Sequence, residues 1–436
     1  MRTHNEHKIP VTSRITVEQV DEAGTRQALV RIGRMGVLFM GSNLVRGAAA
    51  FVTSLVIART LGPDTFGRWT LCVTWASMLT FLLDLGFGVL LTRDVAAGTA
   101  RAGAMVGGAL AARMTLFVPV ATLFLATAPA LGLRGEAASV LWTLLLLAAS
   151  GMAYGAVAAV FRAWPATLTA IVIVEVTGAL LQLGGTWWVT RQHGGVAALL
   201  LLASAVQIAQ ISAAALLWRV VADAGPVFER PSLRSAVSLV RRAFPFALAG
   251  LVVNVQERLA PLMLGQLSGI GEVALFGAAW RIGSIVRMLP QAMFGGALPV
   301  LAATAKQEGS ENVAFRFERV LSISAGIAAT GLAVFAGPVL RLTYGADYAP
   351  GALTLIWVAI GLWPFLINSA RKVSLYAVGQ ERLAVRWSAV ALAIQVVACV
   401  LLIPRYGSAG AALAMAVGEV AVWWPLRAVV TNSMKT

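Results

Sequence analysis

The sequence is poor in charge and in the residues that usually build catalytic or metal centres. Only 12% of its 436 residues are charged, against about 25% in a typical soluble domain. A soluble enzyme of this length is excluded, because it could not cover its surface with so few charges. The three histidines, His4, His7 and His193, have no ligand partners near them in the sequence, and Cys72 and Cys399 lie inside apolar stretches. We therefore expect neither a disulfide framework nor a metal site.

The chain has instead long apolar runs that contain no charge. Among them are 114–133, 137–161, 192–218, 320–340, 348–370 and 387–404, none of which is shorter than eighteen residues. A helix needs about 20 residues to cross the hydrocarbon core of a bilayer. Only helices and closed barrels satisfy their backbone groups there, and the runs lack the alternation of barrel strands. We therefore predict an all-α, polytopic membrane protein.

The apolar segments predict about twelve transmembrane helices. They lie near 35–57, 70–91, 105–131, 137–161, 168–190, 195–218, 243–265, 274–300, 320–340, 350–370, 387–403 and 408–426.

A charged stretch at 219–242, which we interpret as a cytoplasmic linker, divides these spans into six and six. This division predicts an N-terminal half at 35–218 and a C-terminal half at 243–426, with tails at 1–34 and 427–436. The pairs Phe66-Gly67 and Phe276-Gly277 are a weak sign of an internal repeat. Since transporters are commonly built from two repeats, we expect two pseudo-symmetric six-helix bundles around a central cavity.

Lysine and arginine are distributed unevenly between the two sides of these predicted spans. The side that holds both chain ends carries 23 of the 34, and the other side carries 6. Cytoplasmic loops of membrane proteins have such an excess. We therefore predict a multi-pass membrane protein with both termini in the cytoplasm. The same bias accounts for the net charge of +15, so we do not expect a nucleic-acid partner.

Nine ionisable residues fall within the predicted spans, where each costs about 2.5–3.5 kcal/mol at the bilayer centre. They are Arg46, Asp84, Arg113, Glu175, Glu257, Arg258, Arg281, Arg287 and Glu419. Six of the nine lie in the opening helix pairs of the two halves. We expect those six to line a shared, water-accessible cavity.

The cavity is predicted to bind an anionic substrate, because arginine outnumbers acid there and a guanidinium binds phosphate with a rigid fork. Asn43 and Arg46 are three residues apart, and Asn254 and Arg258 four, so each pair shares a helix face. An amide beside a guanidinium suits a ligand with both hydroxyls and phosphate. The predicted substrate-binding residues are Arg46, Arg258, Arg281, Arg287, Asn43 and Asn254.

Simpler roles remain open for several of the other charges. Asp84 and Arg113 lie near span ends, where they could cap a helix, and Glu175 and Glu419 could form hydrogen bonds between helices. Glu257 could neutralise an arginine of another span. Asp84 and Glu257 are also candidate proton or sodium sites, and we expect no cofactor beyond such a coupled ion.

The first hairpin carries a recognisable motif. Leu55-Val56-Ile57-Ala58-Arg59-Thr60-Leu61-Gly62-Pro63-Asp64-Thr65-Phe66-Gly67 is followed by Asp84-Leu85-Gly86 and Thr92-Arg93-Asp94. This pattern resembles the opening of bacterial polysaccharide transporters and O-antigen-type flippases, in the multidrug/oligosaccharidyl-lipid/polysaccharide exporter superfamily. The segment from Leu262 to Arg281 and the Tyr344–Tyr348 loop are similar to later parts of that family.

The resemblance implies a flippase of the bacterial cytoplasmic (inner) membrane. Such a protein moves a lipid-linked oligosaccharide, usually on a polyprenyl diphosphate, between the leaflets by alternating access. It implies membrane lipids, a polysaccharide polymerase and export machinery as partners. A cation-coupled drug exporter and a peptidoglycan-precursor flippase of the same superfamily remain alternatives. We do not expect an enzyme, because the chain has no nucleophile elbow, phosphate-binding loop or large polar loop.

Overall fold

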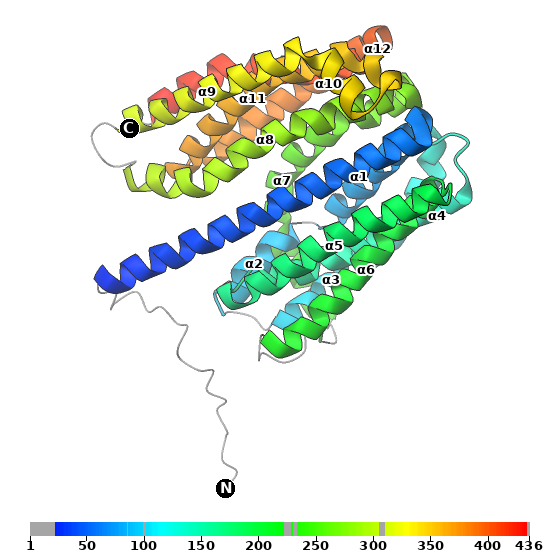
Figure 1. Ribbon diagram of the computed structural model, residues 1–436. Coiled ribbons are helices and arrows are strands. Elements are labelled where there is room, and N and C mark those ends of the chain that lie inside the picture. Colours follow the sequence, from blue (N-terminus) through cyan, green and yellow to red (C-terminus); the bar gives the residue numbers. More distant parts are fainter. Residues whose placement is uncertain are drawn as a thin grey trace.

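Figure 1 shows the computed structural model, which describes residues 22–84, 86–98, 102–221, 228–229, 233–304 and 310–433. Within these ranges the chain is helical and has no β-strand, as predicted. The α-helices are α1 (Glu22–Asp84), α2 (Phe87–Ala96), α3 (Ala102–Thr127), α4 (Ala138–Phe161), α5 (Pro165–Arg191), α6 (Val196–Val221), α7 (Leu233–Leu267), α8 (Ile270–Thr304), α9 (Ser310–Val334), α10 (Ala336–Thr343), α11 (Ala352–Ala377) and α12 (Glu381–Ser433). Two short 3₁₀ helices, η2 (Ala128–Leu131) and η3 (Ala346–Gly351), precede α4 and α11.

Many of these helices are long and apolar enough to cross a bilayer. Seven segments of the described ranges meet that condition, and α9 with α10 makes an eighth if this pair, bent by 72°, is one span. The protein is therefore a polytopic membrane protein. The count of twelve spans stays a prediction.

Two of the longest helices are interrupted at a glycine. Gly62 in α1 has φ 77°, and Gly407 in α12 has φ 52°. Positive φ favours glycine because it has no Cβ. The chain changes direction at both breaks, so α1 contains the first two predicted spans and α12 contains the last two. The Glu272 carboxylate accepts the backbone N–H of Ser408 at 2.6 Å and so satisfies a donor beside the second break.

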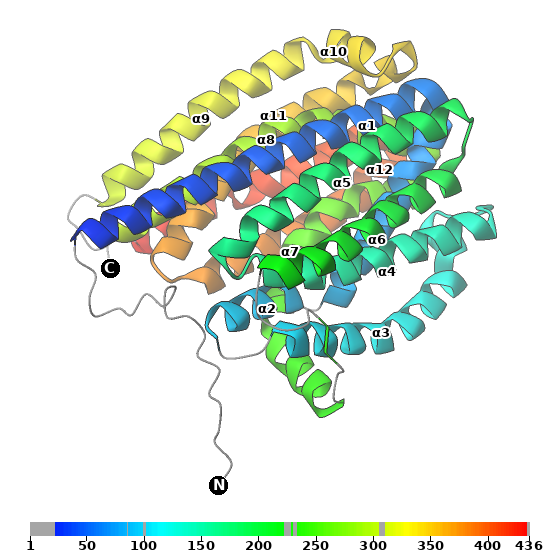
Figure 2. The ribbon, with the colours of Figure 1, turned by 60° about the horizontal axis from the view of Figure 1, so that its bottom comes forward.

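The helices form two groups that meet along α1, α7 and α8. In Figures 1 and 2, α2–α6 lie together on one side, and α8–α12 lie together on the other. α1 packs against α4 and α5 on one side and against α7 and α8 on the other. We call α1–α6 the N-terminal half and α7–α12 the C-terminal half. The end of the bundle that holds Gly62, Gly269 and Gly407 is called the Gly62 end.

The two Phe-Gly pairs noted in the sequence lie at the interface between the halves. Gly67 of α1 packs on the backbone of Ile270 in α8, where a Cβ would overlap the Ile270 carbonyl oxygen. Gly277 of α8 packs in turn on α1, where a Cβ would lie 3.1 Å from Cγ2 of Thr70. Each glycine thus lets the other half approach closely. The motif joins the two halves, in addition to making the turn at Gly62.

Aromatic and polar contacts also join the halves at the Gly62 end. The ring centroid of Phe66 lies 5.8 Å from those of Tyr344 and Tyr348, on the far side of the interface. The Ser54 and Tyr344 hydroxyls are 2.9 Å apart, and Arg59 donates to the last carbonyl of α10 at 2.7 Å. The halves also touch at the opposite end of the bundle, where Arg242 of α7 pairs with the buried Asp94 of α2.

Helices extend into the segments predicted as tails and linker. α1 begins inside the predicted tail 1–34, of which residues 1–21 lie outside the described part. α7 begins inside the predicted linker 219–242, and α12 ends inside the predicted tail 427–436. Charges mark where side chains leave the lipid, whereas a helix satisfies its own backbone and can continue into water. The division of the chain into domains stays a prediction.

Candidate functional site

A cavity of about 300 Å³ lies within the C-terminal half, between α7, α8, α11 and α12. This volume is at the lower end of the range for ligand pockets, about 300–1,000 Å³. Its wall combines aromatic rings with amide, hydroxyl and charged groups. These lining residues include Gln256, Glu257, Trp280, Arg287, Trp357, Phe365, Ser369, Lys372, Tyr376, Gln395 and Glu419.

Arg287 is one of the predicted substrate-binding residues, and it lines this cavity. Its guanidinium donates to the Glu257 carboxylate at 3.2 Å. The guanidinium carbon also lies 3.6 Å from the ring centroid of Phe365 and 4.5 Å from that of Trp280. Arg287 is thus neutralised by an acid of α7 and packed between rings of α8 and α11. Glu257 has the arginine partner on another span that we considered for it.

Glu419 on α12 is held by amides. Gln256 donates to one of its carboxylate oxygens at 3.0 Å, and Asn368 donates to the other at 2.9 Å. Gln395 then donates to the backbone carbonyl of Gln256 at 3.0 Å. Four buried polar side chains from α7, α11 and α12 are thereby linked. The expected interhelical hydrogen bonding of Glu419 is confirmed.

Lys372 is a cavity residue that the sequence interpretation missed. The tenth predicted span, 350–370, ends two residues before Lys372, which places this residue in a predicted loop. Helix α11 continues to Ala377, so Lys372 lies on the same helix face as Phe365, Ser369 and Tyr376, which also line the cavity. The helical spacing of these four residues was the signal that could have found it.

Arg258 and Arg281 have different surroundings from Arg287, because both reach across to α1. Arg258 of α7 donates to the Ser77 hydroxyl at 3.0 Å and to its own helix neighbour Asn254 at 2.9 Å. Arg281 of α8 lies with its guanidinium carbon 4.7 Å from the ring centroid of Trp69. Within the described part of the chain, neither guanidinium lies within ion-pair distance of a carboxylate. The predicted pairing of Asn254 with Arg258 is confirmed.

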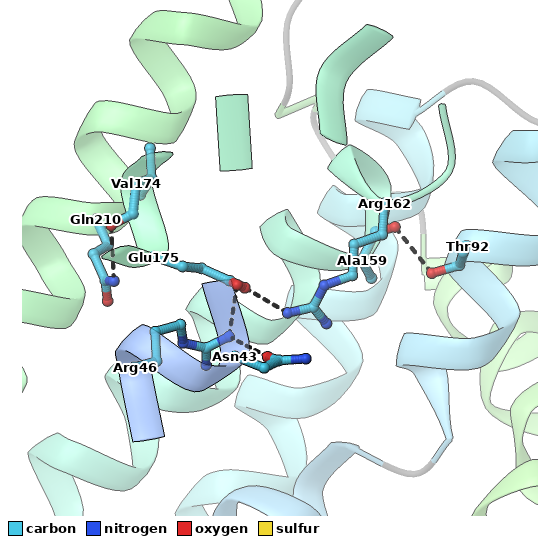
Figure 3. A network of polar contacts seen from close by, with 8 residues as sticks. All are labelled: Asn43, Arg46, Thr92, Ala159, Arg162, Val174, Glu175 and Gln210. Atoms are coloured by element: carbon cyan, nitrogen blue, oxygen red, sulfur yellow. Dashed lines mark hydrogen bonds and ion pairs between the residues drawn. The ribbon is translucent and has the colours of Figure 1, made fainter. Parts of the chain in front are cut away.

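Arg46 lies in a third place, a cluster of charges within the N-terminal half (Figure 3). Its guanidinium donates to Glu175 of α5 at 2.6 Å and to Asn43 at 3.4 Å. Arg162, which directly follows α4, donates to the other oxygen of the same carboxylate at 2.6 Å. The shared helix face of Asn43 and Arg46 is confirmed, and Glu175 joins three helical segments. Arg162 was counted only as a loop charge in the sequence.

Asp84 forms an ion pair with Arg113. Arg113 of α3 is fully buried and also donates to the Met152 carbonyl at 2.7 Å. Asp84 accepts the Gly88 N–H at 3.3 Å, beside the break between α1 and α2. The capping role considered for Asp84 is therefore present.

The predicted binding residues thus lie in three places. Arg287 and Glu257 line the cavity of the C-terminal half. Arg258 and Arg281 lie at the interface between the halves, and Arg46 lies in the Glu175 cluster. Among the residues that line this cavity, only Arg287 belongs to the predicted set of arginines. The predicted roles of these residues in substrate binding stay predictions.

Solved structures show which class of protein has this fold. A multidrug resistance MATE family transporter of the MOP superfamily, in its inward-facing conformation, superposes with a TM-score of 0.73 at 14% identity, covering 90% of this chain and 96% of its own. The lipid II flippase MurJ, in an inward closed conformation, has a TM-score of 0.71 at 14% identity. This match covers 91% of the present chain and 89% of MurJ. A MOP superfamily transporter from Pyrococcus furiosus Vc1 has a TM-score of 0.63 at 14% identity. This match covers 93% of the present chain and 96% of that transporter. The fold is that of MOP superfamily transporters.

The sequence places the chain more narrowly. A search of curated protein sequences finds no match. The family model for polysaccharide biosynthesis proteins matches residues 33–305, which is more than half of the chain. The protein belongs to this family, as the motif of the first hairpin led us to expect. The family and the structural neighbours are transporters or flippases and not enzymes, in agreement with the prediction.

Proposed function

We propose that this protein is a flippase that moves a lipid-linked oligosaccharide, carried on a polyprenyl diphosphate, across the cytoplasmic membrane. One observation carries this proposal. Arg258 and Arg281 project from the C-terminal half onto α1, and neither forms an ion pair with a carboxylate in the described part of the chain. A guanidinium within a membrane is costly without a counter-charge. Two such groups between the halves therefore favour an anionic headgroup as the ligand.

In this proposal the interface between the halves holds the diphosphate, and the polyprenyl tail stays in the lipid. The halves rock against each other and expose the headgroup to either side of the membrane. Arg258 contacts α1 through one hydroxyl of Ser77, and Arg281 contacts it through an aromatic face. Both contacts are easily exchanged for phosphate oxygens, which accept charge-assisted hydrogen bonds from the guanidinium fork.

The cavity of the C-terminal half suits the sugar part of such a substrate. Trp357 and Phe365 supply apolar faces, and Gln395 and Ser369 supply amide and hydroxyl groups. Its small volume fits a terminal part of a glycan and not a long chain. Trp280, which also lines this cavity, contacts Arg287 and stacks on Phe276.

The proposal is tested by replacing Arg258 and Arg281 together with alanine. We expect the variant to lose export of the surface glycan and transport of the lipid-linked oligosaccharide in vesicles, at unchanged protein level. Arg191→Ala is the matched control, because Arg191 lies at the Gly62 end and packs on the ring of Trp187. Full export by a variant with alanine at Arg46, Arg258, Arg281 and Arg287 would contradict the site.

The other superfamily functions are outcomes of related assays. Complementation of a strain that lacks its peptidoglycan-precursor flippase would indicate that substrate, which is also an anionic lipid. Resistance of an overexpressing strain to organic cations, without glycan export, would indicate a drug exporter.

The predicted location and partners belong to the same proposal. They are the bacterial inner membrane, with both termini in the cytoplasm, and membrane lipids, a polymerase and export machinery as partners. Asp84 and Glu257 remain the proposed coupling sites for a proton or sodium ion. Each is held by an arginine, so a coupled ion would have to compete with Arg113 or Arg287. A transport rate independent of pH and sodium in vesicles would exclude this coupling.

A further inference from the structure

The charge cluster in the N-terminal half consists of Arg46, Arg162 and Glu175. Glu175 is buried, with 1% of its side chain exposed, and both of its oxygens accept from arginines. One carboxylate thus balances two guanidiniums, which leaves one positive charge in excess. Figure 3 shows Arg46 and Arg162 pointing toward Glu175 from different helices.

The exposure of these two arginines distinguishes them from Arg113 and Arg371. Arg113 and Arg371 also pair with acids, but their side chains are 0% and 1% exposed. Each of those two donates further to a backbone carbonyl, at 2.7 and 2.6 Å. Arg46 and Arg162 are instead 37% and 38% exposed.

Donors therefore remain available on Arg46 and Arg162. A guanidinium has five N–H donors. Within the described residues, Arg162 donates only to Glu175, and Arg46 donates only to Glu175 and Asn43. Two guanidiniums that share one carboxylate lie side by side, with their unused N–H groups outside the pair. A phosphate group accepts such donors in pairs.

The surroundings hold this arrangement in place. Thr92 of α2 donates to the Ala159 carbonyl at 2.9 Å, close to the end of α4 from which Arg162 extends. Gln210 of α6 donates to the Val174 carbonyl at 3.2 Å, next to Glu175. The cluster is therefore built on helices that are fixed to one another.

The cluster lies on other helices than Arg258 and Arg281, and its acid is in the half of α5 that is farther from the Gly62 end. Arg162 follows the last residue of α4, and α4 begins at the Gly62 end. Its side chain extends back to Glu175, which lies sixteen residues from the end of α5, or about 24 Å of helix. In the predicted orientation this half of α5 is the one nearer the cytoplasm, the side on which the substrate is loaded.

We propose that Arg46 and Arg162, held together by Glu175, form a diphosphate-binding site that receives the lipid-linked substrate before it reaches Arg258 and Arg281. This inference rests on the proposed function. It adds Arg162 as a binding residue and Glu175 as the residue that positions both arginines.

The experiment measures binding to the full-length protein in phosphatidylcholine nanodiscs. The probe is a polyprenyl diphosphate without sugar, and polyprenyl monophosphate and phosphatidylglycerol are the comparison ligands. We expect Arg46→Gln and Arg162→Gln each to weaken diphosphate binding at least tenfold. Arg162→Lys keeps the charge but not the fork, so its affinity should fall between those of the wild type and Arg162→Gln.

Arg371→Gln is the matched control, because it breaks a similar ion pair, to Glu318, whose arginine has no exposed donors. Arg191→Gln is a second control that breaks no ion pair among the described residues. Melting temperatures measured without ligand show whether each variant is folded. Both controls should bind the diphosphate with wild-type affinity, even where Arg371→Gln lowers the melting temperature.

Three results would overturn the inference. Diphosphate affinity that is unchanged in Arg162→Gln would show that the cluster only fastens α1 to α4 and α5. Equal competition by phosphatidylglycerol would assign it to anionic lipids in general. Equal loss of affinity in Arg371→Gln would show that the effect is one of stability.

If Arg162→Gln binds normally while the Arg258 and Arg281 variant loses export, this inference fails and the proposed function stands. If the wild type binds no polyprenyl diphosphate, the proposed function fails as well.

Discussion

At the scale of single residues, the intramembrane charges have three kinds of surroundings. Arg46, Arg113 and Arg287 pair with acids of other helices. Glu419 is bound by amides, and Arg281 packs on an aromatic face. A buried ion pair offsets part of the cost of taking two charges out of water. Arg258 and Arg281, which form no ion pair among the described residues, therefore have capacity for a ligand, as do Arg46 and Arg162, which share one acid.

Glu136, in the loop before α4, gives a prediction about pH. Burial raises the pKa of this carboxyl above its ordinary value of 4.5, and nearby Arg68 offsets this only in part. The folded protein therefore holds the proton more tightly than the unfolded chain. The stability linked to Glu136 is complete below pH 4.5 and is lost as the pH rises through the raised pKa.

Glu136→Gln should remove this dependence, since glutamine does not titrate. We expect the melting temperature of the variant to exceed that of the wild type at pH 7, with the difference shrinking toward pH 4. The measurement is thermal unfolding in detergent over this pH range. Glu381→Gln, at an exposed position, is the control and should follow the wild type. A difference that grows as the pH falls would contradict the prediction.

At the scale of elements, the contact between α1 and α8 depends on two glycines. A Cβ at Gly67 would overlap the Ile270 carbonyl oxygen, and a Cβ at Gly277 would lie only 3.1 Å from Cγ2 of Thr70. Close helix contacts of this kind let backbones approach in membranes, where packing and not the hydrophobic effect drives association. The Phe-Gly repeat of the sequence is thus an interface between halves.

Replacing Gly67 with alanine should force α1 and α8 apart, because the new methyl group would overlap the Ile270 carbonyl. Overpacking of this kind typically costs about 1–3 kcal/mol. We expect a lower melting temperature and reduced glycan export. Gly271→Ala is the control, since a Cβ there meets no atom within 4 Å. Equal stability of the two variants would show that the α1–α8 contact is loose.

At the scale of the whole molecule, alternating access requires the contacts at the Gly62 end to open. Ser54 and Tyr344 lie in different halves, and their hydroxyls are 2.9 Å apart. In a background without Cys72 and Cys399, cysteines at these two positions joined by a short bifunctional reagent should arrest transport. Reduction of the link should restore it. Continued transport with the link in place would exclude rocking of the halves at this end.

Thr354 and Ser408 provide the matched control for this experiment. Their hydroxyls are 2.8 Å apart, but both residues belong to the C-terminal half. A link between cysteines at these positions should leave transport unchanged if each half moves as a unit. Arrest by this link would indicate that α11 and α12 move against each other during transport.

Local pattern was sufficient for several predictions. The scarcity of charge and the length of the apolar runs predicted helices that cross a membrane, and the first hairpin predicted the family. The pairs Asn43 with Arg46 and Asn254 with Arg258 followed from helix geometry, because residues three or four apart are neighbours on one face.

Distant pairings were not predictable in the same way. Arg46 is 129 residues from Glu175, and Arg287 is 30 residues from Glu257. Which acid meets which arginine depends on how helices pack, and many pairings are compatible with the same spacing along the chain. The positions of Lys372 and Arg162 were not predicted, because both residues lie just beyond the ends of predicted spans. In the structure Lys372 lines the cavity of the C-terminal half, and Arg162 pairs with Glu175 of α5.

The sequence by itself determined that this protein lies in a membrane as a bundle of helices, because a bilayer admits few other solutions for so apolar a chain. It also determined which residues carry charge into that bundle. The tertiary structure alone decided which of those charges neutralise one another and which keep donors available. These pairings depend on contacts between helices that are far apart in the chain. A shift of a few ångströms between two helices breaks an ion pair and leaves the donors of its arginine available to a ligand.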